Sequence, residues 1–551
     1  MKVSKKIWSL ATTTLITVAF MGMMYYLALP AWNFRSPGLW WFLFFTALVF
    51  AAVSSLKKAI VYFRDEDYSE EEFHFKVTIG SWITTVGLLL TIGVLALISA
   101  DCFHAGAAYA VADVQKSEAG IGESFADLSK AENQSSLPLV DLDTAITLGD
   151  KKVAGLKNAS WYDVDDEYNL IKYGERYYRL SVIDYVDLFK YNTANSTGIP
   201  GYVLVDCTPE NGAVTQSAQL VELETPIRYS PGAFWGNDLR RHLRGQYPGY
   251  MFDESFLEID EEGTPYWVTG VKGPTCGVWG VMTVESFILT NAQTGESKEY
   301  SIEEAPDWVD HVFSLDYLMQ VAGWHYAYKD GWWNSWIGQT GVWRTSYSYR
   351  DERKNKDDGE FANFYGYSST VMDGEVVFYT GLTAANSAES NLGWLTIDTS
   401  TGKMTEYSVV GAEESSAQAA VEQLVSAQRY QATFPLPTNI NGEASYVMCL
   451  KGNAGLVQGY AICNMENYSI AVQAATLPEA VDAYLTKLGK KPATDNAAET
   501  QPSTEASGTK DVHAIFDSDR VVESYSVEVN NTVQYYYILD DGSIYCVVKV
   551  K

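Results

Sequence analysis

Three long runs without a charged residue open the chain and set the strongest limit on its fold. They are Trp8–Leu29, Leu39–Leu56 and Val77–Ala100, with 22, 18 and 24 residues. A helix needs about 20 apolar residues to cross the hydrocarbon core of a bilayer, and charge-free runs of this length are rare in soluble helices. We therefore expect three transmembrane helices. Because the runs contain no ionisable side chain, we expect an anchor and not an ion or proton pathway.

Positive residues in the short flanks predict how these helices are oriented, because Lys and Arg gather on the cytoplasmic side of membrane proteins. Such residues precede the first run or lie between the second and the third, at Lys2, Lys5, Lys6, Lys57, Lys58, Arg64 and Lys76. The loop between the first two runs has only Arg35. We predict a cell-membrane protein with a cytoplasmic N-terminus and a large extracytoplasmic region. A cleaved signal peptide at the first run would leave that region on the same side.

The remainder of the chain is strongly acidic. Residues 1–76 carry eight basic and six acidic side chains, and the whole chain carries 39 and 69, so 31 basic and 63 acidic side chains follow residue 76. Nucleic-acid binding needs clustered Lys and Arg to neutralise phosphates, so we expect no nucleic-acid partner. The hydrophobic share of 47% is enough for substantial cores and is well above that of disordered chains.

Composition divides the chain into five segments. These are a three-helix anchor (1–101), a helical stalk (102–135), an α+β region with two or three tandem units (136–490), a disordered linker (491–510) and a small β-rich domain (511–551). The stalk is Ala-rich and is interrupted near Gly120 and Gly122. The linker is rich in Pro, Thr, Ser and Glu without apolar periodicity. The last segment alternates as strands around the Asp-Gly turn of "DDGSIYCVVKV".

The α+β region contains internal similarity. "FILTNAQTGESKEYSI" (287–302) and "WLTIDTSTGKMTEYSV" (394–409) align at an offset of 107, with Gly295 and Gly402 in the same place. Each predicts a strand, a turn ending in Thr-Gly and a second strand, since Gly adopts the positive φ that such a hairpin needs. "AFWGNDLRRHLRGQYPGYMFDESFLEIDEEGTPYWV" and "ESSAQAAVEQLVSAQRYQATFPLPTNINGEASYVMCL" each predict a helix, a break, a strand, a turn and a strand. We expect tandem units of a helix plus an antiparallel sheet.

This pattern resembles the PepSY type of extracytoplasmic module. The resemblance rests on a helix followed by strands, on "G-x-P-Y-x-V" at Gly263 to Val268 and on the closing "D/N-x-x-T-G", and it covers Phe234–Glu296 and Glu414–Tyr468. The chain also looks like an uncharacterised family of membrane-anchored envelope proteins of Gram-positive bacteria, through "GIPGYVLVD", "EIDEEGTPYWV", "APDWVD" and "GWWNSWIG". The PepSY resemblance implies binding and the restraint of peptidases. It brings no catalytic residues.

A search for catalytic and metal motifs gives no candidate. H-E-x-x-H, G-x-S-x-G and the P-loop are missing, and the six cysteines show neither C-x-x-C nor a zinc spacing. Cys276 could be a thiol nucleophile, but such a residue needs an activating partner, and we expect a structural cysteine in a strand. We expect no catalytic residue, no metal site and no cofactor. Enzyme activity stays open, because a site assembled from distant residues leaves no local pattern.

Four tryptophans in "DGWWNSWIGQTGVW" are the candidate binding residues: Trp332, Trp333, Trp336 and Trp343. A single helical turn would place Trp332 and Trp336 on the same side. The indoles could pack in a core between tandem units, where each would bury a large apolar area. They could instead rest on the membrane or bind a partner, since Trp favours lipid–water interfaces and protein hot spots. A glycan platform is a third possibility.

A local basic cluster in "LRRHLRGQYPG" is a second candidate. It consists of Arg240, Arg241, His242 and Arg244. Such a cluster in an acidic protein could bind an anion such as a phosphate or a carboxylate. Alternatively, the helix face pairs with neighbouring acids.

These features favour a non-enzymatic envelope membrane protein whose extracytoplasmic region binds a protein partner or an envelope component. One alternative is a cell-wall or peptide hydrolase, or a regulator of a peptidase, with a site made of distant residues. Another is an accessory subunit of a membrane transport or secretion complex. Its mark would be small residues on the span faces, for which Gly80, Gly87 and Gly93 in the third run are candidates.

Overall fold

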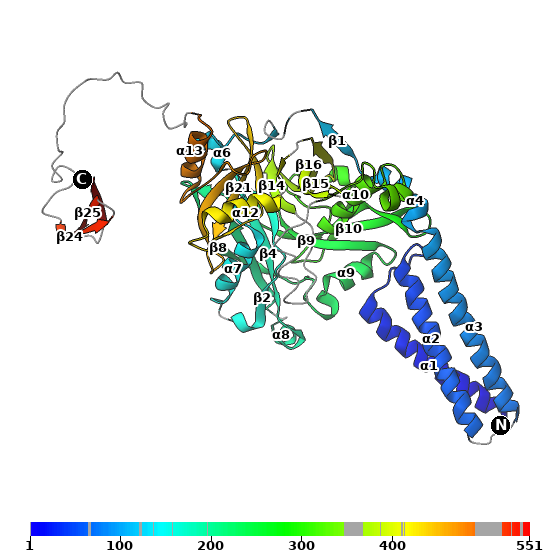
Figure 1. The fold of residues 1–551 in the computed structure, drawn as a ribbon. Helices are drawn as coiled ribbons and strands as arrows, with labels where there is room; N and C mark the ends of the chain where they lie inside the picture. Colours follow the sequence, from blue (N-terminus) through cyan, green and yellow to red (C-terminus); the bar gives the residue numbers. More distant parts are fainter. Residues whose placement is uncertain are drawn as a thin grey trace. The chain divides into compact units, whose positions relative to one another are not determined.

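Figure 1 shows a computed structural model of the protein. It describes residues 2–63, 68–118, 120, 124–135, 137–156, 158–194, 197–345, 367–385, 387–408, 411–412, 414–490, 521–529, 532–539 and 544–550. The chain forms two compact units, Met1–Thr494 and Asp495–Lys551. The linker predicted at 491–510 lies outside the described residues.

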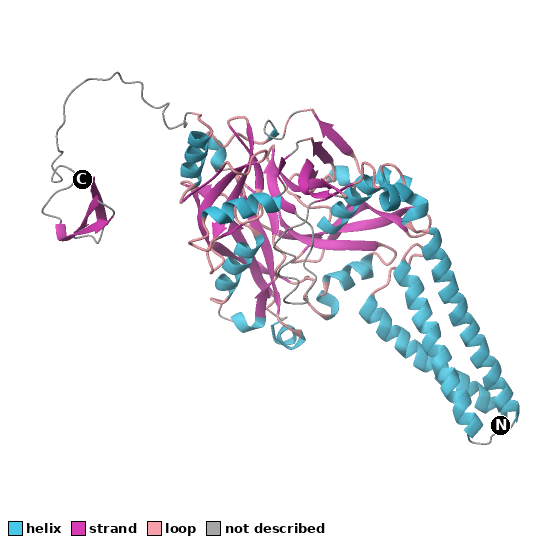
Figure 2. Ribbon diagram, viewed as in Figure 1, coloured by secondary structure: helices cyan, strands magenta, loops and turns pink. Residues whose placement is uncertain are grey.

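Three apolar helices open the first unit: α1 (Lys2–Ala28), α2 (Pro37–Phe63) and α3 (Tyr68–Ile98). All three are long and apolar enough to cross a membrane, as the uncharged runs predict, and they support a membrane-embedded protein. Several of their hydroxyl groups bond to the carbonyl four residues earlier: the Thr13 hydroxyl donates to Ser9 O and that of Thr17 donates to Thr13 O. This back-bonding removes the cost of a polar group in an apolar environment. Figures 1 and 2 show the helices as one elongated bundle.

The segment after the third helix differs from the predicted helical stalk at 102–135. Helix α4 (Asp101–Val111) ends early and is followed by strand β1 (Val114–Ser117), which pairs in parallel with β17 (Met404–Tyr407). A short helix, α6 (Ala131–Gln134), comes later. The stalk prediction is therefore wrong beyond Val111, because backbone pairing with a strand nearly 300 residues away competes successfully with local helix propensity.

Residues 101–490, called the α+β region from here on, contain four sheets of four or more strands, each preceded in the chain by a helix. The first sheet follows α7 (Leu142–Val153) and has the order β2-β4-β5-β8, with β3 also pairing with β4. Its strands are β2 (Tyr162–Val164), β3 (Asn169–Tyr173), β4 (Arg176–Tyr185), β5 (Ile199–Asp206) and β8 (Ala218–Ile227). Along the chain, helix α8 (Leu188–Ala194) connects β4 to β5, and the β6–β7 hairpin (Pro209–Glu210, Ala213–Val214) connects β5 to β8.

The second sheet is a simple meander with the order β12-β11-β10-β9. It follows helix α9 (Leu239–Gln246), which is capped by the Asp238 carboxylate accepting from Arg241 N–H. Its strands are β9 (Met251–Ile259), β10 (Pro265–Cys276), β11 (Gly280–Asn291) and β12 (Ser297–Tyr300). Strands β10 and β11 form a long hairpin that extends toward α3 (Figure 1).

The third sheet has the order β1-β17-β16-β15-β13, with β14 also pairing with β15 and β18 with β16. All of its strands except β1 follow helix α10 (Leu315–Tyr328). Its remaining strands are β13 (Trp343–Thr345), β14 (Tyr367–Met372), β15 (Glu375–Ala384), β16 (Ser387–Asp398) and β18 (Gly411–Ala412).

The fourth sheet follows α12 (Glu414–Leu424) and has the order β19-β21-β22-β23, with β20 pairing with β21. Its strands are β19 (Gln431–Ala432), β20 (Leu436–Ile440), β21 (Glu443–Lys451), β22 (Val457–Asn464) and β23 (Ala471–Ala474). Helix α13 (Leu477–Lys487) closes the region and begins with a capping box between Thr476 and Glu479.

The two Thr-Gly segments form hairpins of the predicted kind, β11–β12 and β16–β17. In the first turn, the side chain of Asn291 accepts from the N–H of Thr294 at 2.9 Å, and Gly295 has φ +76°. In the second turn, Asp398 accepts from the N–H of Thr401 at 2.9 Å, and Gly402 has φ +72°. The Asx residue fixes the loop, and glycine supplies the left-handed position.

Two hydrophobic clusters hold the α+β region together. The larger joins the first and fourth sheets with parts of the second and third, and contains the fully buried Trp394 and Tyr202. The smaller packs α4 and α10 against β11 and the third sheet, with Phe287 and Leu318 among its members. The fold is therefore a mixed α/β arrangement of several antiparallel sheets after three apolar helices, in agreement with the predicted class. In the second unit, β24 (Val521–Val529), β25 (Thr532–Leu539) and β26 (Ile544–Val550) form the predicted antiparallel sheet.

Candidate functional site

The α+β region contacts the ends of the apolar helices at two places, and the first involves the predicted basic cluster. Arg244, on α9, is only 4% exposed. Its Nε donates to Leu29 O at 3.1 Å, directly after α1, and its Nη1 donates to Tyr250 O at 2.6 Å. Nη1 also lies within hydrogen-bond distance of the carbonyls of Tyr247 and Pro248. The guanidinium therefore joins the first helix to the turn after α9 through charge-assisted hydrogen bonds.

Other groups strengthen this first contact. Arg241 lies over the Tyr26 ring at 4.0 Å and donates to Tyr26 O at 3.3 Å, so it adds a cation–π interaction with α1. The loop between α1 and α2 contributes Trp32 N–H, which donates to Pro248 O at 2.8 Å, and the Asn33 side chain, which donates to Gly249 O at 3.2 Å.

The four residues of the basic cluster do not converge on one point. Arg244 is directed inward to carbonyl oxygens and Arg241 toward Tyr26, while His242 Nε2 lies 2.7 Å from Gly295 O. Arg240 alone of the four is exposed. Burial and the neighbouring charge of Arg240 lower the pKa of Arg244 to about 10, so it stays cationic at neutral pH. An anion site on this cluster remains a prediction.

The second contact lies between the β10–β11 hairpin and the end of α3. Trp279 N–H donates to Ser99 Oγ at 3.0 Å. Gly277 has φ +61°, and a Cβ placed on it would lie 3.3 Å from Ser99 Oγ and from His104 Nε2. Two features of this position therefore favour glycine: the left-handed backbone conformation and the close approach of the hairpin to the end of α3.

The tryptophan segment continues from α10, which packs antiparallel to α4. Ser314 caps α10 by accepting from Tyr317 N–H at 3.2 Å. After the helix, a π-helical turn spans Asn334–Gly338 and ends at Gln339 in the left-handed conformation. The Asn334 side chain closes the turn by donating to Thr340 O at 2.8 Å and accepting from Thr340 N–H at 3.2 Å.

Three of the four predicted tryptophans come together in this turn. The rings of Trp332 and Trp336 stack with centroids 5.9 Å apart, as their spacing predicts, and Trp333 meets Trp332 edge-on at 4.8 Å. Trp333 and Trp336 are each 66% exposed, and the neighbouring Ile337 is 69% exposed. Core packing is therefore the wrong interpretation for these two indoles, because three large apolar side chains face solvent together.

Trp343 is separate from the other three. It begins strand β13, is half-buried and stacks on Tyr326 with ring centroids 5.8 Å apart. It packs against the smaller hydrophobic cluster. For this residue the core interpretation agrees with the structure.

Sequence analysis gave no sign of a buried group of ionisable residues at Glu258, Asp310 and His311. Their exposures are 0%, 6% and 2%. Glu258 Oε1 lies 2.9 Å from His311 Nδ1 and accepts from His311 N–H at 3.1 Å. Asp310 accepts from the N–H of Lys172, on β3, at 2.6 Å. The apolar neighbours in "WVDHVF" are the one local signal that this segment is buried.

Burial controls the ionisation of these groups. Desolvation raises the pKa of Glu258 well above its usual range, and desolvation together with the charge of Glu258 raises that of Asp310 to about 8. Desolvation lowers the pKa of His311 to about 4. Asp310 and His311 are therefore mainly uncharged near pH 7, and burial favours the neutral form of Glu258, because a low-dielectric interior disfavours charge. Their side chains are shielded from solvent, so they do not form an open catalytic site.

Cys276 lies at the end of β10 and is half-buried. Burial and the negative charge of Asp101 raise the pKa of its thiol. This disfavours the thiolate that a nucleophile needs, in agreement with a structural role. Among the described residues, no group of three His, Cys, Asp or Glu side chains is placed to hold a metal ion.

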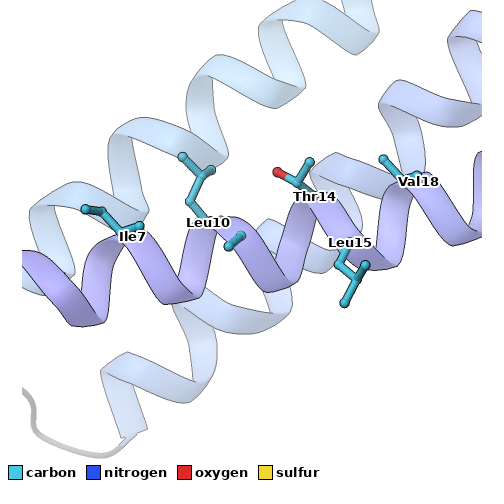
Figure 3. Close-up of a pocket in the computed structure, with 6 residues that line it drawn as sticks. Ile7, Leu10, Thr14, Leu15 and Val18 are labelled. Carbon is cyan, nitrogen blue, oxygen red and sulfur yellow. The ribbon is translucent and has the colours of Figure 1, made fainter.

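Two surface hollows among the described residues are considered for binding. One, of about 480 Å³, lies along α1 and is lined by Ile7, Leu10, Leu15, Val18 and two small residues (Figure 3). It belongs to a helix apolar enough to cross a membrane, so lipid or another helix would cover it. The other, of about 570 Å³, lies between α4, α10 and the β10–β11 hairpin, with Phe313, Leu318 and Val321 in its wall.

Comparison with known proteins gives no relative. No family model, no curated protein and no solved structure matches the chain. The geometry described above is therefore the basis on which function is argued.

Proposed function

We propose that this protein is a non-enzymatic component of the cell envelope whose α+β region binds a protein partner or another envelope component close to the membrane. The two contacts with the helix ends, through Arg244 and through the β10–β11 hairpin, carry this proposal. They hold the α+β region against the ends of the anchor and restrict its orientation. A region held in this way meets its partners at the membrane surface. Because its own orientation is already restricted, it loses less rotational freedom when it binds.

The flanking charges support an extracytoplasmic α+β region with the N-terminus in the cytoplasm. Lys2, Lys5 and Lys6 lie at the start of α1, before its apolar run. Three crossings would place the N-terminus and the α+β region on opposite sides of the membrane. The acidic surface that follows fits a region outside the cytoplasm that does not contact nucleic acid.

PepSY-like tandem units belong to the same proposal. Each of the four sheets follows a helix, and the β11–β12 and β16–β17 turns have the same Asx hydrogen bond and a glycine with positive φ. Gly263 to Val268 form the β9–β10 turn and the start of β10, with Gly263 at φ +81°. Units of this type favour binding or restraint of a peptidase over hydrolysis. The shielded acids Glu258 and Asp310 likewise offer no support for hydrolysis.

Site-specific photo-crosslinking in cells tests this function. A photoreactive amino acid would replace exposed residues of the α+β region one at a time, at Leu142, Leu424, Tyr468 and Trp333. One protein, or one wall polymer, that is captured repeatedly from adjacent positions supports a binding component. If no position gives an adduct and the purified chain cleaves wall fragments or peptides, the hydrolase alternative replaces the proposal.

An accessory subunit of a transport or secretion complex is the second candidate. Gly80, Gly87 and Gly93 of α3 would meet no atom within 4 Å if each carried a Cβ. Gly80 and Gly87, seven residues apart, share one face of the helix, which is open for close helix packing. In the crosslinking experiment, probes beside these glycines would then capture an integral membrane protein. Crosslinks from the α+β region alone would favour the first candidate.

A further inference from the structure

Large apolar side chains lie exposed on the α+β region where it meets the apolar helices. One patch, the indole patch, consists of Trp333, Trp336 and Ile337. A second patch, the α8 patch, consists of Phe189 and Trp235, which are 80% and 50% exposed. A soluble surface seldom keeps such groups together without covering them. The α8 patch contacts a residue at the end of α1 directly, and the indole patch follows helix α10, whose last turns contact Asp101 just past the end of α3.

The indole patch is tied to the end of α3. Asp101, three residues past the end of that helix, accepts from Trp324 Nε1 at 3.3 Å and from the Tyr328 hydroxyl at 3.5 Å. The start of α10, by contrast, shares a hollow with Val111 at the far end of α4. Helix α10 therefore runs back toward α3, and the turn that carries Trp333 and Trp336 continues beyond Tyr328 from that end. Figure 1 shows α4 and α10 together beside the end of α3.

The α8 patch is tied to the end of α1. The Trp235 ring lies 6.2 Å from that of Tyr26, two residues before α1 ends. Trp235 Nε1 also donates to Asn192 Oδ1 at 3.1 Å, and Asn192 lies one turn beyond Phe189 on α8. Because α1 and α3 would cross in the same direction, their ends lie at the same face of the membrane. The two patches therefore approach that face at the ends of two different helices.

The geometry points to the headgroup layer of the same membrane as the occupant of both patches. We propose that Trp333, Trp336 and Ile337 on one side, and Phe189 and Trp235 on the other, insert there and hold the α+β region against the bilayer. Indole suits this layer because its ring is apolar and its N–H is polar. Lipid surrounds every membrane helix, so it reaches both patches at once, whereas one protein partner would have to bind on two sides. This inference rests on the three helices crossing the membrane and not on which partner the region binds.

Environment-sensitive labels on single cysteines test the inference. In the full-length chain, Cys102, Cys276 and Cys546 would be replaced by serine, and Cys207, Cys449 and Cys463 would be kept because they are buried and shielded from the label. Ile337→Cys or Phe189→Cys would then carry a nitrobenzoxadiazole dye. The matched control is Leu424→Cys. Leu424 is also an exposed apolar residue, but it lies at the end of α12, the helix that precedes the fourth sheet. Each protein would be reconstituted in phosphatidylcholine vesicles, with and without phosphatidylglycerol and with headgroup spin-labelled lipid as the quencher.

Blue-shifted emission and quenching at positions 337 and 189, with water-like emission at 424, is the expected result. Loss of the blue shift at 337 after Trp333→Ala/Trp336→Ala is expected too, because the indoles would hold that segment in the headgroup layer. Water-like emission at both 337 and 189 in vesicles overturns the proposal. Shielding that occurs in native membranes but not in vesicles of lipid alone also overturns it and identifies a protein as the occupant. Crosslinking from Leu142, Leu424 and Tyr468, which lie outside both patches, does not depend on this result, so failure here is separate from failure of the proposed function.

Discussion

Arg244 and the group of Glu258, Asp310 and His311 are both buried in the α+β region, but they differ in how the interior accommodates a titratable side chain. Arg244 meets carbonyl oxygens from four residues, beginning with Leu29 at the end of α1. Glu258 has one oxygen bonded to His311, and its Oε2 has no hydrogen-bond partner among the described atoms.

The difference lies in the supply of acceptors. The carbonyls at a helix end and in a turn are free of regular hydrogen bonds, so they can satisfy a cation that remains charged. The interior between the sheets has few such free groups, and there the acids are neutralised by protons instead. The contact with the anchor is thus expected to hold over a wide pH range, whereas the acids make the region's stability depend on pH.

Arg244→Met should give the largest effect. The substitution keeps much of the apolar stem but leaves the carbonyls of Leu29 and Tyr250 without their buried donor. We expect a loss of about 3–5 kcal/mol in the free energy of unfolding, with new protease cleavage in the loop between α1 and α2. Denaturant unfolding of the full-length protein in detergent measures the first effect, and limited proteolysis in vesicles measures the second.

Arg240→Met is the matched control, since Arg240 is the exposed arginine of the same helix. It should change the free energy of unfolding by no more than about 0.5 kcal/mol. Equal effects of the two substitutions would show that the Arg244 contacts do not stabilise the junction with the anchor.

The acids predict a pH dependence of intermediate size. Asp310 has a pKa of about 8 in the fold against 3.8 in a free chain, so the folded state binds more protons in this window and stability falls as pH rises. His311, with a pKa of about 4 against 6.5, acts in the opposite direction, but only below pH 6.5. Between pH 6.5 and 8 His311 no longer opposes this trend, and Asp310 lowers the stability by up to about 1.4 kcal/mol per pH unit.

Asp310→Asn should flatten the stability profile between pH 6.5 and 8, because asparagine can still accept from Lys172 N–H but cannot ionise. Asp316→Asn, at an exposed position on α10, should leave the slope unchanged. The measurement is the free energy of unfolding at several pH values in one detergent. A slope that survives Asp310→Asn in full would assign the pH dependence to other groups.

Gly277→Ala tests the second contact with the anchor, which depends on close approach and not on charge. Gly277 and Gly174 have nearly the same φ, +61° and +63°, but a Cβ on Gly174 would meet no atom within 4 Å. Gly174→Ala should therefore cost only the backbone strain of about 1 kcal/mol. Gly277→Ala should cost roughly 1 kcal/mol more and should loosen the hairpin at Ser99. Hydrogen exchange at Trp279 N–H, which donates to Ser99, reports that loosening, and equal exchange in the two variants would contradict it.

Sequence patterns predicted what depends on neighbours in the chain. The three apolar helices, the Thr-Gly hairpins and the stacking of Trp332 on Trp336 all follow from local periodicity and turn chemistry. The contact of Arg244 with Leu29 could not be predicted in this way, because 215 residues separate the partners. The same is true of Glu258 with His311 and of β1 with β17. For the tryptophans, composition gave the cluster, but only the fold distinguishes exposed Trp333 from half-buried Trp343.

Glu258→Gln should have the smallest effect, and it decides whether the two buried sites differ as described. If the Glu258 carboxyl is neutral, glutamine replaces it with a similar shape and its carbonyl oxygen still accepts from His311 N–H. The free energy of unfolding at pH 7 should then change by less than about 1 kcal/mol. If Glu258 is instead ionised and paired with a protonated His311, the substitution removes one partner of a buried ion pair and should cost about 3–5 kcal/mol. The larger value would mean that this site, like Arg244, keeps its charge. The His311 resonances measured by NMR would then titrate well above pH 4.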